Sequence, residues 1–93
     1  MPDLSKYTKE LSELLETSDN ILLISHINPD GDAIGASLAW YNILINKGFE
    51  VSVVSPNELP CGLNWMAGFD NILDYNKNTL LAAEKINNSD LLI

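Results

Sequence analysis

The 93-residue sequence predicts an α/β fold with a mainly parallel sheet flanked by helices. Apolar runs of strand length alternate along the chain with segments whose apolar residues recur at helical spacing. The first predicted strand, residues 20–25, contains a continuous apolar run at 21–24 rather than an alternating pattern, which is typical of a strand covered on both faces in a parallel sheet. These two observations favour alternating strands and helices over an all-helical or an all-β fold.

The N-terminal segment, residues 3–17, predicts an amphipathic helix, with Asp3 as its N-cap. Its apolar positions recur at helical spacing: Leu4, Tyr7, Leu11, Leu14 and Leu15. We expect this helix to cover one side of the sheet, and a helix that binds a partner is the alternative.

A second helix is predicted over residues 33–47, after which Gly48 should end it. One face of this helix is apolar: Ile34, Leu38, Tyr41 and Ile45. Gly35 in its first turn indicates either a close approach to the strand or substrate phosphate, or a tolerated glycine. Further strands are predicted over residues 51–55, over 72–75 and from 91 onward, with a third helix over 79–86.

Residues 56–70 are rich in proline and glycine and predict an irregular loop. This loop carries three large apolar side chains: Trp65, Met66 and Phe69. We expect them to pin the loop to the body of the domain. The alternative is an exposed role in stacking against nucleic-acid bases.

Three metal-competent side chains, His26, Asp30 and Asp32, follow the first predicted strand within seven residues. Open α/β sheets place their ligand sites at such strand-to-helix junctions. Imidazole and two carboxylates suit a divalent metal such as manganese or magnesium. Gly31 should let the backbone bend so that both carboxylates face one side. The pattern therefore predicts a metal site.

Simpler interpretations remain open at this point. A single histidine near a strand end is often a hydrogen-bonded structural residue, and Asn-Pro-Asp-Gly is also an ordinary turn sequence. A calcium-binding EF-hand loop starting at Asn28 is excluded, because Ala33 and Ala39 occupy the positions that need glycine and glutamate. The chain also has no glycine-rich nucleotide-binding motif.

The segment SHINPDGDAIGAS resembles the first motif of the DHH phosphoesterases. Its N-P-D-G-D-A-x-G form is most similar to the nanoRNase group, the bifunctional oligoribonuclease and PAP phosphatase proteins. The segments GFEVSVVSPNELP and LNWMAGFDNILDY also resemble that group, so the resemblance covers nearly all of residues 20–93.

The resemblance implies that His26 and Asp30 hold one metal ion and Asp32 a second, most often manganese. The family's bridging aspartate, its DHH motif and its fourth aspartate have no counterpart here, and Asp90 precedes an apolar run rather than ending one. We therefore expect residues 1–93 to be the N-terminal fragment of a DHH catalytic domain, cut within a strand, inactive alone and lacking the C-terminal substrate-binding domain. A complete small domain with a C-terminal edge strand is the alternative.

For the parent protein, the resemblance implies a two-metal phosphoesterase. Such an enzyme would hydrolyse short oligoribonucleotides to nucleoside monophosphates, remove the 3′-phosphate of PAP, or do both. A pyrophosphatase or single-strand exonuclease of the same superfamily is one alternative. A non-catalytic binding module is another. A cyclic-dinucleotide-degrading enzyme is disfavoured, because it would need sensor and membrane segments ahead of the site.

Composition narrows the expected partners. The net charge of −8 and the absence of arginine argue against wrapping duplex nucleic acid and against bidentate phosphate recognition. Cys61 is the only cysteine, so no intramolecular disulfide can form, and we expect it to be a small loop or core residue. Without a signal peptide or a membrane-length apolar run, a cytoplasmic protein is expected. An unpaired apolar edge at residues 91–93 would favour self-association, as in a homodimer.

Overall fold

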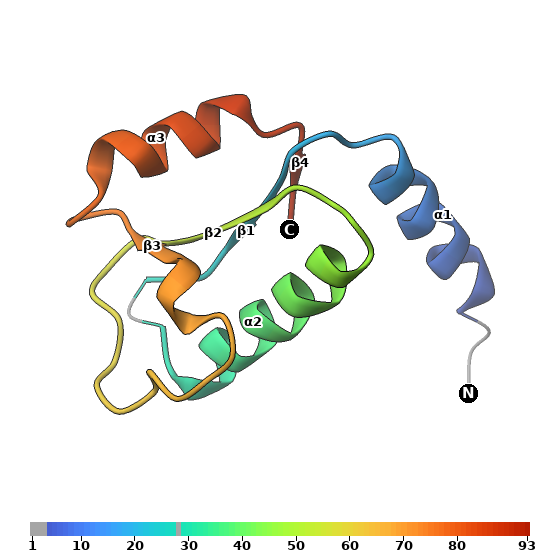
Figure 1. Ribbon diagram of the computed structural model, residues 1–93. Coiled ribbons are helices and arrows are strands. Elements are labelled where there is room, and N and C mark those ends of the chain that lie inside the picture. Colours follow the sequence, from blue (N-terminus) through green and yellow to red (C-terminus); the bar gives the residue numbers. More distant parts are fainter. Residues whose placement is uncertain (1–3, 28) are drawn as a thin grey trace.

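A computed structural model describes residues 4–27 and 29–93 and shows a four-stranded, all-parallel sheet in the order β3-β2-β1-β4 (Figure 1). The strands are β1 (Ile21–Ile24), β2 (Val51–Ser55), β3 (Ile72–Asp74) and β4 (Leu91–Leu92). Ile21 pairs with Val51 on one side and Leu91 on the other, so the three strands start in register. The predicted α/β fold with a parallel sheet is confirmed.

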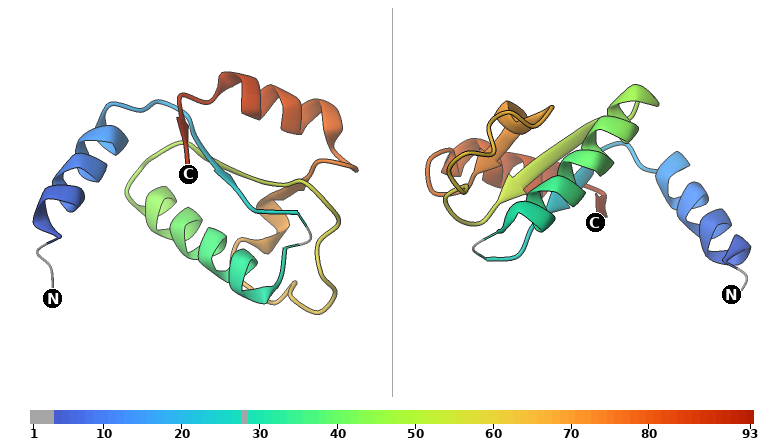
Figure 2. Two further views of the ribbon diagram at one scale, coloured as in Figure 1. Left: turned by 180° about the vertical axis from the view of Figure 1, so that it is seen from behind. Right: turned by 90° about the horizontal axis from the view of Figure 1, so that it is seen from below.

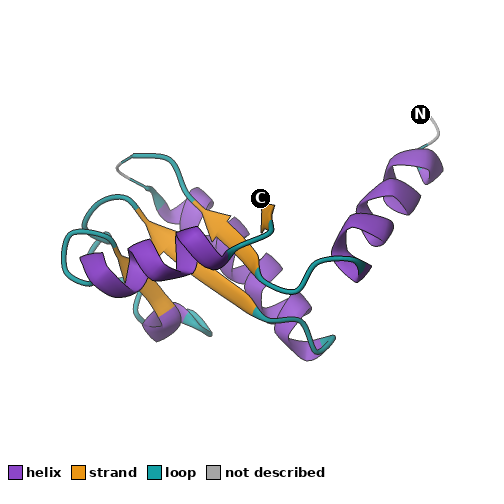
Figure 3. Ribbon diagram, turned by 90° about the horizontal axis from the view of Figure 1, so that it is seen from above, coloured by secondary structure: helices purple, strands orange, loops and turns teal. Residues whose placement is uncertain are grey.

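Within the described residues, three helices accompany the sheet: α1 (Ser5–Glu16), α2 (Gly31–Asn46) and α3 (Thr79–Asn88). A short 3-10 turn, η1 (Phe69–Asn71), precedes β3. Helices α2 and α3 lie on opposite faces of the sheet (Figure 3). Among the described residues, none of these helices is both long and apolar enough to cross a bilayer.

The core consists of two apolar clusters, one on each face of the sheet. Under α2 the buried side chains are Ile21, Leu23, Ile34, Leu38, Leu44, Val53 and Ile72. Under α3 they are Leu22, Val54 and Ala82, with Leu73 and Ile86 packed against them. Successive strand residues point to opposite faces, so the continuous apolar run of β1 serves both clusters. This arrangement fixes β1 at the centre of the domain.

Helix α2 begins two residues earlier than the sequence pattern indicated. Ile34 and Leu38 are buried as predicted, but Leu44 rather than Ile45 completes the buried face, and Ile45 is exposed. Leu44 and Ile45 follow Tyr41 by three and four residues, and both spacings place a residue on the same helix face, so the pattern alone did not separate them. Gly48 ends the turn after α2 with a φ of +90°, as expected of a glycine at that position.

Helix α1 does not cover the sheet, so that expectation is wrong. It extends beyond the β4 side of the sheet at the end of a short linker (Figures 1 and 2). None of its residues is buried, and Tyr7 is 63% exposed, while Leu15 packs against the main core. The expected cap Asp3 lies outside the described residues, and Leu4 occupies the N-cap position without a side-chain hydrogen bond.

The β2–β3 loop is only partly pinned to the domain by its apolar side chains. Met66 and Phe69 pack against the main core, as predicted. Trp65 is 75% exposed, so the expectation that it anchors the loop is wrong. Cys61 is an exposed loop residue. Gly68 has a φ of +87°, and a Cβ there would lie 3.2 Å from Cδ1 of Tyr41, so glycine lets this loop approach α2.

Candidate functional site

The three predicted ligands lie where β1 ends and α2 begins. The backbone N–H of Ser25 donates to the carbonyl of Val54 (3.4 Å), which places His26 just beyond the carboxyl end of β1. Because all four strands are parallel, the loops after β1 and β2 emerge at the same edge, and both views of Figure 2 show them at one end of the molecule. This edge is the usual ligand-binding edge of an open α/β sheet.

The ring of His26 is oriented by its own backbone neighbour. His26 is exposed, and its Nδ1 lies 2.8 Å from the carbonyl oxygen of Ile27. A carbonyl oxygen only accepts, so this hydrogen bond places the proton of the neutral ring on Nδ1. The lone pair of Nε2 is then the one that a metal ion or a proton would take.

Asp30 has a structural role that the sequence analysis did not predict. It is the N-cap of α2, with extended backbone angles (φ −96°, ψ −177°), and its Oδ1 accepts a hydrogen bond from the N–H of Ala33 at 2.9 Å. Its carbonyl accepts from the N–H of Ile34 at 3.0 Å. The sequence therefore uses Asp30 to start the helix, and the cap holds the carboxylate at the junction.

Asp32 is exposed in the first turn of α2, where a negative charge is favourable beside the helix N-terminus. Gly31 does not bend the chain as we expected. It is the first residue of the helix and is not among the described glycines with positive φ. Helical residues one or two positions apart do not face each other, so this local structure does not gather Asp30 and Asp32 by itself.

The resulting site is open. In residues 4–27 and 29–93, no group of three or more His, Cys, Asp or Glu side chains is placed to hold a metal ion. The donor types still suit a divalent cation, because an imidazole nitrogen and carboxylate oxygens are what manganese and magnesium bind. The structure thus brings His26, Asp30 and Asp32 to one junction without closing them around an ion.

Two polar residues at this edge were missed by the sequence analysis. The Oγ of Ser25, directly before His26, is buried and has no hydrogen-bond partner in the described part of the chain. Such orphaned groups are rare and often lie at functional sites. The only sequence signal was a polar residue closing an apolar run.

The second missed residue is Asp74 at the carboxyl end of β3, which is only 5% exposed. Its Oδ1 accepts from the N–H of Asn76 at 2.9 Å, and its carbonyl accepts from the N–H of Asn78 at 2.8 Å. Asp74 therefore shapes the turn into α3 and places a carboxylate at the ligand-binding edge.

Asp90 lies at the opposite edge, as its place before an apolar run suggested. It immediately precedes β4, and its carboxylate accepts hydrogen bonds from the N–H groups of Asp19 and Asn20. These two hydrogen bonds hold the pKa of Asp90 below its usual value. Asp90 is thus a structural residue in this chain and no part of the candidate site.

No family model matches the sequence, and no curated protein does. A solved structure of an exopolyphosphatase-related protein from Bacteroides fragilis superposes with a TM-score of 0.88. It is 36% identical in sequence, and the match covers 94% of this chain and 26% of that chain. The chain therefore spans about a quarter of that protein's length. Over nearly all of its residues, this chain has the fold of one part of an exopolyphosphatase-related protein.

Proposed function

We propose that this chain is the first part of the catalytic domain of a metal-dependent phosphoesterase of the DHH type. The observation that carries the proposal is the placement of His26, Asp30 and Asp32 at the β1–α2 junction of this fold. The name of the Bacteroides fragilis relative supports phosphoester or phosphoanhydride hydrolysis as the reaction class.

In this proposal, His26, through Nε2, and Asp30, through its carboxylate, would hold one metal ion, and the carboxylate of Asp32 would hold a second. The bound metal, manganese by preference, would supply Lewis-acid stabilisation of the charge that develops on the phosphate. The protein's own contribution is orientation. Ile27 fixes the tautomer of the His26 ring, and the N-cap hydrogen bond fixes the Asp30 carboxylate. The bridging ligands and the substrate clamp would come from outside this chain.

The substrate we propose is a short oligoribonucleotide or PAP. This choice depends on the N-P-D-G-D-A-x-G form of the motif, which resembles the nanoRNase group. The acidic composition without arginine supports this choice, because the chain offers little positive surface for binding a long polyanion. Hydrolysis of inorganic polyphosphate is the second candidate, and the description of the structural relative favours it.

Metal binding can be tested on the 93-residue chain itself. Addition of Mn²⁺ should broaden the amide NMR signals of the β1–α2 junction selectively, with weak affinity because the ligand set is open. His26→Ala and Asp32→Asn should each reduce the broadening. Asp19→Asn is the matched control, because Asp19 is an exposed acidic residue before the amino end of β1. The site would be refuted if Asp19→Asn reduced the broadening and His26→Ala left it unchanged.

Under this proposal, hydrolysis needs ligands beyond those of this chain, so activity is tested in a longer protein that carries these residues. There, His26→Ala, Asp30→Asn and Asp32→Asn should each remove most manganese-dependent hydrolysis of a dinucleotide, whereas Asp19→Asn should leave the rate unchanged. Dinucleotides to pentanucleotides should be cleaved faster than long RNA at physiological salt. Full activity of any ligand variant would exclude that residue from the metal site, and equal rates on short and long RNA would favour an exonuclease.

A further inference from the structure

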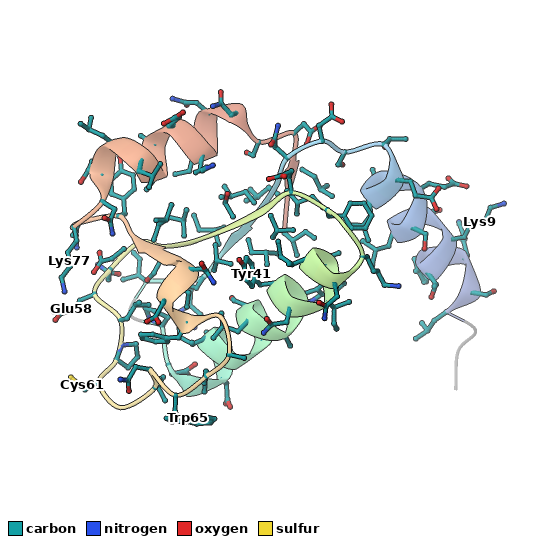
Figure 4. The ribbon with its side chains drawn as sticks, viewed as in Figure 1. Lys9, Tyr41, Glu58, Cys61, Trp65 and Lys77 are labelled. Carbon is teal, nitrogen blue, oxygen red and sulfur yellow. The ribbon has the colours of Figure 1, made fainter. Side chains whose placement is uncertain are left out.

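A concave site lies at the same edge of the sheet as the proposed metal site, between the β2–β3 loop and the turn that leads into α3. Its volume is about 510 Å³, within the usual range for small-molecule sites. Its polar lining consists of Glu58, Asn64, Asp70, Asp74, Lys77 and Asn78. Figure 4 shows Glu58, Cys61 and Lys77 along this side of the molecule. The predicted ligands of the metal site do not line this pocket.

The charge of the pocket argues against a phosphate as its occupant. Its described lining includes three carboxylates, from Glu58, Asp70 and Asp74, and one ammonium group, from Lys77. A phosphate would meet net negative charge, and like charges in a partly desolvated site repel strongly. The carboxylates also form no metal-binding group within the described residues. The pocket therefore suits a ligand part that carries no negative charge and offers hydrogen-bond donors.

The remaining lining suits a heterocycle and a sugar. Phe69 and Ile72 provide an apolar wall, and both belong to the main core or pack against it. The amides of Asn64 and Asn78 each supply donors and an acceptor, which match the mixed edge of a nucleobase. Carboxylates accept hydrogen bonds from ribose hydroxyls and exocyclic amino groups. Together these groups match a nucleoside.

The distance between the pocket and the proposed metal site is about the length of one nucleotide. Ile24 of β1 pairs with Val54 of β2, and Ser55 of β2 pairs with Asp74 of β3. Neighbouring strands lie about 4.8 Å apart, so the end of β3 is roughly 10 Å from the end of β1, where His26 lies. A single nucleotide spans such a gap between its phosphate and its base.

We infer that this pocket binds the nucleoside part of the substrate, while the phosphate lies at His26, Asp30 and Asp32. The inference depends on the proposed function and deepens it. It selects nucleotide substrates over inorganic polyphosphate, which has no uncharged part to place between Phe69 and the two asparagine amides. It also places a base contact within this chain, in addition to any contacts that a C-terminal domain would make.

The single cysteine provides a direct test. Cys61 is exposed and lines the pocket, so maleimide labels this site alone. The labelling is done in EDTA with adenosine or guanosine as competitor. At a nucleoside concentration ten times the nucleoside's dissociation constant, simple competition should slow the labelling of Cys61 roughly tenfold. Tripolyphosphate should not slow it. A Cys61→Ser, Ser12→Cys double variant is the control, because its thiol lies on α1, away from the pocket.

Variants then identify the contacts. Asn64→Ala and Asn78→Ala should each weaken the protection of Cys61 by nucleoside. Asn87→Ala is the matched control, because Asn87 is an exposed asparagine of α3 that does not line the pocket. Circular dichroism shows whether each variant remains folded. If Asn78→Ala unfolds, Asn64→Ala alone decides, because Asn64 lies in a loop outside the helices and strands.

The inference is overturned if neither nucleoside protects Cys61 up to its solubility limit, or if tripolyphosphate protects it equally well. Protection by spermidine without protection by nucleosides would overturn it in favour of a polyamine site. The assay uses no metal and no phosphoester, so its result is independent of hydrolysis. Failure of the proposed function would instead appear as unchanged activity in the His26 and Asp32 variants of the longer protein.

Discussion

Asp90 and Asn20 are held together by a reciprocal pair of hydrogen bonds. The N–H of Asn20 donates to Oδ1 of Asp90 (2.9 Å), and the N–H of Asp90 donates to the carbonyl of Asn20 (2.9 Å). Oδ2 of Asp90 accepts a third hydrogen bond, from the N–H of Asp19 at 2.8 Å. These contacts join the segment before β1 to the start of β4. They set the parallel register of a strand only two residues long.

Replacing Asp90 should therefore loosen β4. Asp90→Ala removes both acceptor oxygens, whereas Asp90→Asn keeps one of them. We expect stability against urea to fall in the order wild type, Asp90→Asn, Asp90→Ala, with faster amide exchange at Leu91 to Ile93. Asp19→Asn is the control, because it alters an exposed side chain and leaves the Asp19 N–H in place. Equal stability of all four proteins would show that β4 forms without this carboxylate.

The same contact predicts a pH dependence. Hydrogen bonds from Asp19 and Asn20 lower the pKa of Asp90 in the folded protein relative to the unfolded chain. The stabilisation is therefore complete above the unfolded pKa and is lost as pH falls through the lower, folded value. The stability difference between wild type and Asp90→Ala should be constant near neutral pH and shrink in acid, below the ordinary aspartate range. Urea unfolding of both proteins across this range measures it.

Two substitutions of Asp30 distinguish its role as the N-cap of α2 from its proposed role as a metal ligand. Asp30→Ala removes the N-cap of α2 and should cost about 1 kcal/mol of stability. Asp30→Asn keeps the capping oxygen and should cost far less, because asparagine caps as well as aspartate does. Both variants should weaken Mn²⁺ binding, since both lose the charged carboxylate. If Asp30→Asn bound Mn²⁺ like wild type, Asp30 would be a cap only.

Ser25 and Ser55 form a matched pair at the ends of neighbouring strands. Ser25 has a buried hydroxyl without a partner in the described residues, whereas the Ser55 hydroxyl donates to the carbonyl of Asn57 at 2.7 Å. Ser25→Ala should raise the free energy of unfolding by about 1 kcal/mol, and Ser55→Ala should lower it by a similar amount. Thermal and urea unfolding of both variants measure this. Destabilisation by Ser25→Ala would mean that its hydroxyl is paired in solution.

Comparing alanine substitutions at Gly68 and Gly48 distinguishes the cost of backbone strain from the cost of steric crowding. Both have positive φ, +87° and +90°, so an alanine at either position should cost about 1–2 kcal/mol. At Gly48 a Cβ meets nothing within 4 Å, whereas at Gly68 it lies 3.2 Å from Tyr41 Cδ1. Gly68→Ala should therefore be the more destabilising, by about 1 kcal/mol. In a Tyr41→Ala background the two costs should become similar, as urea unfolding would show.

The elements of this fold could be predicted because they depend on local patterns. The continuous apolar run of β1 and the helical spacing of Ile34 and Leu38 each report burial directly. The role of α1 could not be predicted, because its apolar spacing shows which face is apolar but not what that face packs against. Trp65 was misplaced for a similar reason: loop residues have no periodicity, so their burial depends on tertiary contacts.

The sequence identified the residues of the candidate site but not their arrangement in space. His26, Asp30 and Asp32 were identified by residue type and spacing, and the structure places them at the expected junction. Their arrangement depends on where α2 starts, which the pattern placed two residues late, at Ala33. Asp74 was missed because it follows a short apolar run in a segment of turn-forming residues. Its role appears only when parallel pairing brings the ends of β2 and β3 together.

The small contact between α1 and the rest of the domain has a consequence for local unfolding. Helix α1 has twelve residues, none of them buried, although Leu15 near its end packs against the main core. Such a helix is marginal in water on its own, so its hydrogen bonds should break without disturbing the sheet. Backbone deuterium uptake should then separate into two classes, fast throughout Ser5–Glu16 and slow in β1 and β2. A protease should cut first in α1 and leave a trimmed core that still carries the β1–α2 junction. In energetic terms, this chain consists of a stable sheet with an independently melting arm.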